Sequence, residues 1–302
     1  MRLAAATVAL VLALAGCGGG DDDPPATSGV ATDAPVLRIG TKNFTEQYIL
    51  GELYAQALRA KGFPVELKRD VGSSEIIHQA LTGGALDMYP EYIGVLLSEV
   101  ANERRRPMDP DAAYRAAREF ENGNGFELLE ATPFSDQNAL AVTPEFARRN
   151  DMHDIGDLRR LPGAVRIGAP PEFRTRFEGL VGLEQRYGLR DAEVVPLAIG
   201  RQYDELDEGR VDAAAVFTTD GRLAGRRYVL LRDPRVVFAS QHVAPVISRR
   251  ALRAHGPKLP EAIDAVSRRL TEDAMRDMNA AVEDGARPEA VAADFLRGAN
   301  LK

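Results

Sequence analysis

The residue types that carry out nucleophilic or metal chemistry are sparse in this sequence. The four histidines are far apart, and none stands at a metal-ligand spacing from another: His78, His153, His242 and His255. Because zinc sites are built from closely spaced His and Cys residues, we expect no metal site. The sequence also has no Gly-x-Ser-x-Gly nucleophile elbow, no dinucleotide fingerprint and no Walker motif. Only together with the tether and the two-unit pattern described below do these features favour a binding protein without a cofactor over an enzyme.

Cys17 is the only cysteine, so an intrachain disulfide is excluded. It follows Arg2 and an apolar run at 3–15 that is too short to span a bilayer as a helix. The segment Leu14-Ala15-Gly16-Cys17 resembles a bacterial lipoprotein cleavage box. This resemblance implies that residues 1–16 are a signal peptide and that a lipid on Cys17 anchors the chain outside the cytoplasm, at the bacterial cell membrane. The alternative is an ordinary signal peptide with an incidental cysteine.

Composition separates a tether from a folded part. Residues 17–35 are rich in Gly, Asp, Pro and Thr and predict a flexible segment. Over the whole chain, 45% of the residues are hydrophobic and 27% are charged, which is typical of a globular protein. The net charge of −7 argues against nucleic acid as a partner, since duplex binding needs a concentrated basic surface.

Strand and helix patterns alternate from Val36 onward and predict a mainly parallel sheet. In the first unit we expect strands at 36–40, 65–67 and 85–89 with helices at about 43–60 and 73–81. Pro90 suits the first turn of a further helix.

A second unit of the same kind starts near Asn138. Its expected strands and helices alternate: strands at 139–142, 165–168, 193–197 and 213–217, and helices at 155–161, 176–187 and 202–208. After Val243 the chain is predicted to be helical, with one amphipathic helix that ends at Gly285 and another at 288–296.

The two units share a short fragment. Leu81-x-x-Gly84-x-Leu86-Asp87 is repeated as Leu206-x-x-Gly209-x-Val211-Asp212, and each copy ends a helix and enters a strand. The repeat suggests internal symmetry, although chance similarity of helix-to-strand turns would look the same. Ligands in open α/β sheets lie beyond the carboxyl ends of strands. We therefore expect one cleft near the segments 41–45, 72–74, 89–92, 170–176 and 217–220.

Six motifs in this order resemble the osmoprotectant-binding proteins of ABC transporters, whose ligands are glycine betaine, carnitine, choline and proline betaine. The motifs lie at 39–47, 72–78, 86–94, 172–176, 217–221 and 244–246. The resemblance covers about residues 36–302. It implies an α/β, two-lobed type II periplasmic-binding-protein fold with two crossovers. Lobe 1 would comprise residues 36–137 plus 243–302, and lobe 2 residues 138–242.

The same resemblance implies which side chains bind the ligand. Lys42 matches a basic residue after the first strand, Arg176 an arginine that reaches the ligand's carboxylate, and Tyr92 a tyrosine of an aromatic cage for the ammonium. Three other cage positions carry Asn138, Phe217 and Gln241. A cation is attracted to ring faces, so a cage with fewer rings binds it more weakly.

These assignments have alternatives. Arg176 could pair with Glu172 or Glu178, Lys42 could be a solvated charge, Tyr92 and Phe217 could pack in the core, and Asn138 and Gln241 could be hinge residues. The implied function is that of a monomeric lipoprotein that delivers a small zwitterion, such as glycine betaine, to a permease with an ATPase. The depleted cage leaves open a different polar zwitterion, such as an amino acid or a related betaine. An enzyme on this scaffold and a sensory or adhesive lipoprotein are the other classes.

Overall fold

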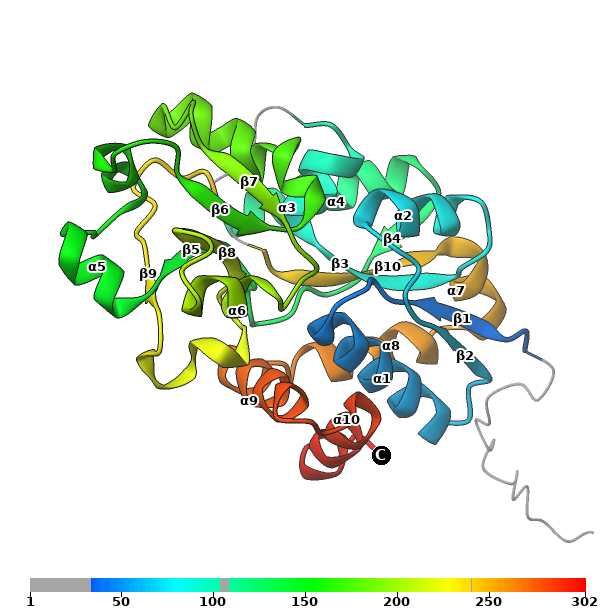
Figure 1. Cartoon of the computed structure of the whole chain (residues 1–302). Helices are drawn as coiled ribbons and strands as arrows, with labels where there is room; N and C mark the ends of the chain where they lie inside the picture. The colour runs from blue at the N-terminus through cyan, green and yellow to red at the C-terminus, as the bar shows by residue number, and fades with distance from the viewer. Residues whose placement is uncertain (1–33, 104–108, 240) are drawn as a thin grey trace, which may run out of the picture.

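The computed structural model describes residues 34–103, 109–239 and 241–302, arranged as two lobes side by side (Figure 1). The predicted signal peptide, the Cys17 lipid site and nearly all of the tether lie outside the described residues. Each lobe contains one five-stranded sheet with helices packed against it (Figure 1). We refer to the lobe with the first strand as lobe 1 and to the other as lobe 2.

The sheet of lobe 1 has the order β2-β1-β3-β10-β4, in which only β10 is antiparallel to its neighbours. Its strands are β1 (Leu37–Gly40), β2 (Val65–Lys68), β3 (Met88–Tyr92), β4 (Phe126–Leu128) and β10 (Val243–Ser248). Its helices are α1 (Thr45–Ala60), α2 (Ser74–Thr82), α3 (Ile93–Val95), η1 (Leu96–Val100), α4 (Pro110–Gly123), α7 (Arg249–His255), α8 (Lys258–Ser267), α9 (Glu272–Glu283) and α10 (Pro288–Gly298).

The sheet of lobe 2 repeats this topology in the order β7-β6-β8-β5-β9, with β5 as the antiparallel strand. Its strands are β5 (Asn138–Val142), β6 (Arg166–Ala169), β7 (Glu193–Pro196), β8 (Ala213–Phe217) and β9 (Val229–Leu230). Its helical segments are α5 (Pro144–Asn150), η2 (Ile155–Arg160), η3 (Pro171–Arg174), η4 (Phe177–Val181), η5 (Leu183–Tyr187), α6 (Gln202–Asp207) and η6 (Gly221–Arg226).

Two crossovers join the lobes. The chain leaves the first sheet after β4, enters the second at β5, and returns from β9 to β10. The crossing segments run antiparallel, paired at Ser135 and His242, and the Asp136 N–H donates to the Gln241 carbonyl at 3.1 Å. The predicted two-lobed fold with two crossovers is confirmed. The lobe limits at 137/138 and 242/243 stay a prediction.

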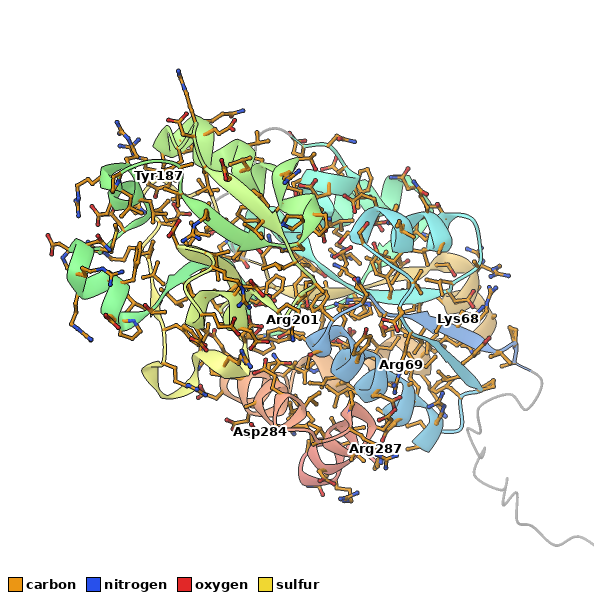
Figure 2. The ribbon with its side chains drawn as sticks, in the orientation of Figure 1. Lys68, Arg69, Tyr187, Arg201, Asp284 and Arg287 are labelled. Atoms are coloured by element: carbon orange, nitrogen blue, oxygen red, sulfur yellow. The ribbon has the colours of Figure 1, made fainter. Side chains whose placement is uncertain are left out.

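Helix α1 is the central packing element of lobe 1. Leu50, Leu53 and Tyr54 on this helix are fully buried, against a core that also contains residues of α8, α9 and α10. Arg69, labelled in Figure 2, follows β2 and holds α10 against α1, since its guanidinium pairs with Glu52 and, at 2.5 Å, with Glu289. The C-terminal helices thereby return to the lobe in which the chain began. No helix in the described part of the chain has both the length and the apolar character needed to cross a membrane.

The repeated fragment occupies equivalent places in the two lobes. The Asp87 carboxylate accepts hydrogen bonds from the N–H, Nε and Nη2 of Arg38 at 2.8–3.0 Å. The Asp212 carboxylate accepts from the same three atoms of Arg166 at 2.8–3.1 Å. The glycine before each aspartate has a positive φ, 75° at Gly84 and 69° at Gly209. The two lobes are therefore built on one plan.

Two predictions about strands are wrong. The third strand runs over 88–92 rather than 85–89, with Pro90 in its middle instead of in a helix. Pro90 lies opposite Pro245 of β10, so two residues that lack an N–H face each other. The segment after Val243 is a fully buried strand before any helix begins, because its apolar residues fit a strand covered on both faces.

Two predictions about helices are also wrong. The expected long helix after 258 is divided into α8 and α9, because Thr271 caps a new helix by accepting from the Ala274 N–H. The expected helix at 176–187 is broken, with Arg176 extended and Glu178 and Gly179 outside helical geometry. The sequence reading did not include α4, α5, β4 and β9. The expected helix at 155–161 is present as the short 3-10 helix η2, which Asp154 caps by accepting from the Gly156 N–H.

Candidate ligand-binding site

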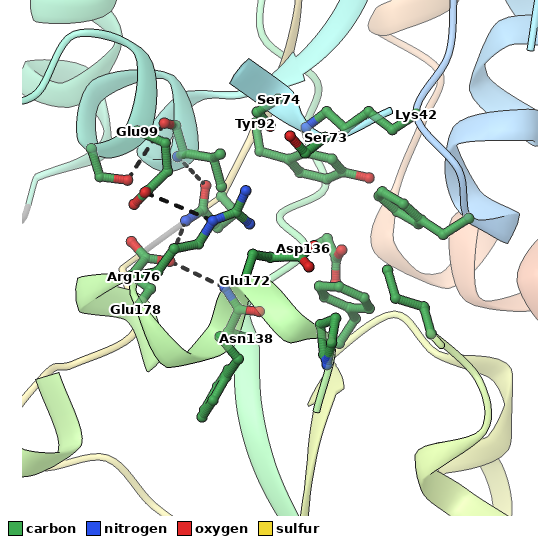
Figure 3. A pocket seen from close by; sticks show the side chains of 18 of the residues that line it. Lys42, Ser73, Ser74, Tyr92, Glu99, Asp136, Asn138, Glu172, Arg176 and Glu178 are labelled. Carbon is green, nitrogen blue, oxygen red and sulfur yellow. Dashed lines mark hydrogen bonds and ion pairs between the residues drawn. The ribbon is translucent and has the colours of Figure 1, made fainter. Parts of the chain in front are cut away.

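A cavity lies between the two lobes, beside the crossovers (Figure 3). It measures about 750 Å³ when its open mouth is included. All six side chains that the sequence predicted as ligand contacts line this one cavity: Lys42, Tyr92, Asn138, Arg176, Phe217 and Gln241. Their contact with a ligand stays a prediction. Asn43, Phe44, Ser73, Ser74, Glu99, Asp136, Glu172, Phe173 and Glu178 line it as well.

Three aromatic rings form a stack along the cavity. The Phe44 ring lies between Tyr92, at a centroid distance of 6.0 Å, and Phe217, at 5.5 Å. The interplanar angles are 26° and 17°, so the rings are nearly parallel. Tyr92 and Phe44 belong to lobe 1 and Phe217 to lobe 2, so the stack spans both lobes. Ring faces and edges of this kind attract cations and accommodate methyl groups.

The fold fixes each ring at the end of a regular element. Tyr92 is the last residue of β3 and Phe217 the last residue of β8, the equivalent strands of the two sheets. Phe44 precedes α1 in an extended conformation, with φ −148° and ψ 163°. The Tyr92 hydroxyl donates to Glu46 Oε1 at 2.9 Å, which fixes the orientation of that ring.

Lys42 is buried and already has partners within lobe 1. Its ammonium forms an ion pair with Glu91, which is fully buried, and lies 4.5 Å from the centroid of the Tyr92 ring. Burial lowers the pKa of Lys42 from its ordinary value, and the Glu91 carboxylate acts in the opposite direction. The charge of Lys42 is therefore neutralised by Glu91 beside the Tyr92 ring and is not exposed to solvent.

Arg176 reaches across the cavity from lobe 2 to two carboxylates of lobe 1. Its Nη2 donates to both carboxylate oxygens of Glu75, at 3.1 and 3.2 Å, and its Nε lies 3.7 Å from Glu99 Oε2. Figure 3 shows Arg176 and Glu99 on facing sides. Pairing with Glu172 or Glu178, the alternative considered from the sequence, is not what the structure shows. Arg176 thus connects the two lobes.

The two amides that replace cage rings both hold a carboxylate. The Glu178 side chain is 4% exposed, and its Oε2 accepts from Gln241 Nε2 at 2.6 Å and from Asn138 Nδ2 at 3.2 Å. Gln241 Oε1 also accepts from the Val95 N–H at 3.1 Å, so this side chain touches both lobes. The two amides therefore lie at the crossovers between the lobes, and they also hold the Glu178 carboxylate at the cavity wall.

A second group of acids lies beside the ring stack. Asp136 lines the cavity, and burial together with the nearby Glu46 carboxylate raises its pKa well above the ordinary value. Burial likewise raises the pKa of Glu46, whose Oε2 accepts from Thr219 at 2.6 Å and Asn279 at 2.9 Å. Thr219 is in lobe 2, so this hydrogen bond is a further contact between the lobes. Among the described residues, no group of three or more His, Cys, Asp or Glu side chains could hold a metal ion.

Sequence reasoning missed three kinds of site residue. Phe44 lies within the motif at 39–47 but was not identified as a ring of the site. Glu75 and Glu99 could not be found, because their pairing with Arg176 joins residues from different lobes. Glu178 was considered only as a partner for Arg176. Glu178 lies two residues after Arg176, and only the fold shows that it faces two amides at the crossovers.

The fold and the cavity between its lobes define a two-lobed solute-binding protein. A family model for the substrate binding domain of ABC-type glycine betaine transport systems matches residues 35–298, and the chain belongs to this family. It is therefore a substrate-binding protein of an ABC transporter, a class that acts outside the cytoplasm together with a permease and an ATPase.

Individual relatives agree with this assignment. The chain is 33% identical over 280 residues to a glycine-betaine-binding protein from Pseudomonas aeruginosa, covering 89% of each chain. It is 28% identical to the glycine betaine-binding protein YehZ from Escherichia coli, covering 87% of this chain and 90% of the relative. The crystal structure of a glycine betaine/carnitine/choline ABC transporter superimposes with a TM-score of 0.71 at 25% identity, covering 88% of this chain and 99% of that chain.

Proposed function

We propose that the cavity binds a small quaternary-ammonium solute of the betaine type and that the protein hands it to the permease of an ABC importer. The observation that carries this proposal is the stack of Tyr92, Phe44 and Phe217, because ring faces bind an ammonium that cannot donate hydrogen bonds. Glu178 lies at the same cavity and adds negative charge. The names of the relatives support the same ligand class.

The six predicted residues then divide into three groups. Tyr92 and Phe217 contact the ammonium directly, with Phe44 between them. Asn138 and Gln241 act through Glu178, which they hold at the wall. Lys42 and Arg176 shape the remaining walls, since each is paired with glutamates.

Ligand binding is coupled to closure of the lobes about the two crossovers. The ring stack, the Arg176 pairs and the Glu46–Thr219 hydrogen bond all join lobe 1 to lobe 2. A ligand in the cavity adds contacts to both sides and favours the closed arrangement.

A lipid on Cys17 would keep the receptor near its permease, and residues 17–35 would supply the reach. This part of the proposal rests on the lipoprotein-like segment at 14–17. Cys17→Ser should move the protein from the membrane fraction to the soluble extracytoplasmic fraction. Unchanged membrane association of the variant would contradict it.

We further propose that the protein is a monomer and not an enzyme. The alternative ligand is a different polar zwitterion, such as an amino acid or a related betaine, because amides stand at two positions that carry rings in the family's cage. Phe44, however, adds a ring that the sequence did not indicate, and this favours the quaternary ammonium.

Removing the central ring tests the proposal. We expect Phe44→Ala to weaken binding of a trimethylammonium ligand about tenfold, or about 1.4 kcal/mol, in isothermal titration calorimetry. Phe146→Ala is the control, because Phe146 is a partly buried ring of α5 that packs in the lobe 2 core outside the cavity. Equal affinity in the wild type and in Phe44→Ala, or tight binding of an amino acid without a quaternary ammonium, would overturn it.

A further inference from the structure

The basic side chains at the cavity are engaged by the protein's own acids. Among the described lining residues, Lys42 and Arg176 are the basic ones, and four acids stand beside them: Glu99, Asp136, Glu172 and Glu178. Lys42 is neutralised by Glu91, and Arg176 by Glu75 and Glu99. An incoming carboxylate would have to displace one of these glutamates or lie beside it.

Of the two basic side chains, Arg176 is the one whose pairing decides whether a ligand carboxylate can bind. Glu75 binds Arg176 Nη2 with both oxygens, at 3.1 and 3.2 Å, and thus occupies the nitrogen that a guanidinium needs for either of its two-nitrogen contacts with a carboxylate. The Arg176 side chain is 19% exposed and that of Glu99 16%, so water weakens their interaction only in part. Two carboxylates around one guanidinium leave a net negative charge, which repels a third carboxylate.

One described hydrogen-bond donor at this end of the cavity, in the Arg176 guanidinium, has no acceptor. Within the described residues, Arg176 Nε is buried and has no hydrogen-bond acceptor, and Glu99 lies 3.7 Å from it. A ligand hydroxyl fits such a place, because one oxygen can accept from Nε and donate its proton to a carboxylate. A ligand carboxylate can accept but cannot donate, so it would leave the acids of this wall unsatisfied.

We infer that Glu75 and Glu99 are specificity-determining residues that withhold Arg176 from ligand carboxylates and select a quaternary-ammonium alcohol, a monocation, over the corresponding zwitterion. The inference rests on the proposed function and specifies its ligand. The ammonium lies at the ring stack and the hydroxyl at Arg176 and Glu99. The negative cavity wall favours the monocation further, since its charge is not cancelled by a carboxylate.

Choline and glycine betaine are the matched probes, because both have a trimethylammonium head and they differ in a hydroxymethyl against a carboxylate group. Calorimetric titration of the full chain should give at least tenfold tighter binding of choline. The double variant Glu75→Gln/Glu99→Gln frees Arg176 and should lower this preference at least tenfold, through a gain in affinity for glycine betaine. The single variants should lie between.

Controls separate the inference from general effects. Glu66→Gln removes an acid of lobe 1 that is exposed and outside the cavity, and it should leave the choline preference unchanged. Thermal unfolding shows which variants are folded, and the single variants serve if the double variant is not. A wild type that prefers glycine betaine, or a preference that the glutamine variants do not alter, overturns the inference while the proposed function stands. If neither probe binds, the proposed function falls and the inference with it.

Discussion

The two lobes share one strand order but differ in the chain that follows β1 in lobe 1 and the equivalent strand β6 in lobe 2. In lobe 1, β1 leads through Lys42 and Phe44 into α1, an unbroken helix from Thr45 to Ala60 with a largely buried surface. In lobe 2, β6 leads into the short segments η3, η4 and η5, with Arg176 extended between the first two. The shared topology determines where the site lies. The different segments after β1 and β6 supply different side chains from each lobe.

The break in lobe 2 has a specific cause at Gly179. A Cβ there would lie 2.2 Å from the Phe173 carbonyl oxygen, so only glycine allows the chain to pass so close. This approach holds Glu178 and Arg176 in their places at the cavity. In lobe 1, by contrast, the unbroken helix α1 follows the residues that line the cavity.

Replacing Gly179 is the strongest test of this difference. We expect Gly179→Ala to lower the free energy of unfolding by about 3 kcal/mol, because the new methyl group overlaps backbone that cannot move freely. Gly123→Ala in α4 of lobe 1 is the matched control, since a Cβ there meets nothing within 4 Å. Urea denaturation measures both. A Gly179→Ala loss no larger than that of Gly123→Ala would show that the break is not imposed by this contact.

The paired aspartates test how equivalent the lobes are. Asp87→Asn should cost about 2 kcal/mol and Asp212→Asn about 1 kcal/mol at pH 7, because the Asp87 side chain is 6% exposed against 20% for Asp212. Asp87 also pairs with Arg250 at 2.7 Å. Equal losses in chemical denaturation would mean that burial does not distinguish the two sites.

Lowering the pH should remove the stability that the Asp87 carboxylate contributes. Burial acts to raise the pKa of Asp87, but hydrogen bonds from Arg38 outweigh it and hold the pKa below its ordinary value. A depressed folded-state pKa gives stability that is present above the unfolded pKa, near 4, and is lost as pH falls through the folded value. The difference between the wild type and Asp87→Asn should therefore shrink toward pH 3.

A buried acid in lobe 1 should make stability depend on pH in the opposite direction. Glu121 is fully buried, its two carboxyl oxygens have no hydrogen-bond partner among the described residues, and the His78 ring nitrogen Nδ1 lies 3.7 Å away. Burial, with a lesser contribution from Glu91, raises the pKa of Glu121 to about 8. Between pH 4.5 and 8 the folded protein keeps this proton and the unfolded chain releases it, so stability falls as pH rises.

The Glu121→Gln variant should remove this dependence. Relative to the wild type, its free energy of unfolding should increase by about 3 kcal/mol between pH 5 and pH 8, as measured by denaturation at both values. Glu119→Gln, an exposed change on the same helix, should leave the wild-type slope unaltered. A wild-type stability that is flat over this range would contradict the buried, protonated state.

The sequence predicted the alternating elements and the location of the cavity well, because both follow from local patterns. Residues at or just after strand ends, such as Phe217 and Lys42, lie at one edge in any sheet of this kind. Pro90 was misassigned because proline also suits a first helical turn, and only the opposing Pro245 shows why it fits a strand.

The pairing of charges could not be predicted. Arg176 and Glu75 are 101 positions apart and meet only when the lobes face each other. No local pattern favours Glu75 over Glu172, which is nearer to Arg176 along the chain. Local signals thus locate the site, whereas the partners of its charged groups depend on the tertiary arrangement.

The ring stack has a consequence for the order of events during solute capture. Because Phe217 belongs to one lobe and Phe44 and Tyr92 to the other, the complete aromatic surface exists only while the halves are together. A solute entering a separated pair meets an incomplete surface first and is held weakly. Its release then waits for the halves to part, so residence time is governed by reopening and not by the strength of any one ring contact.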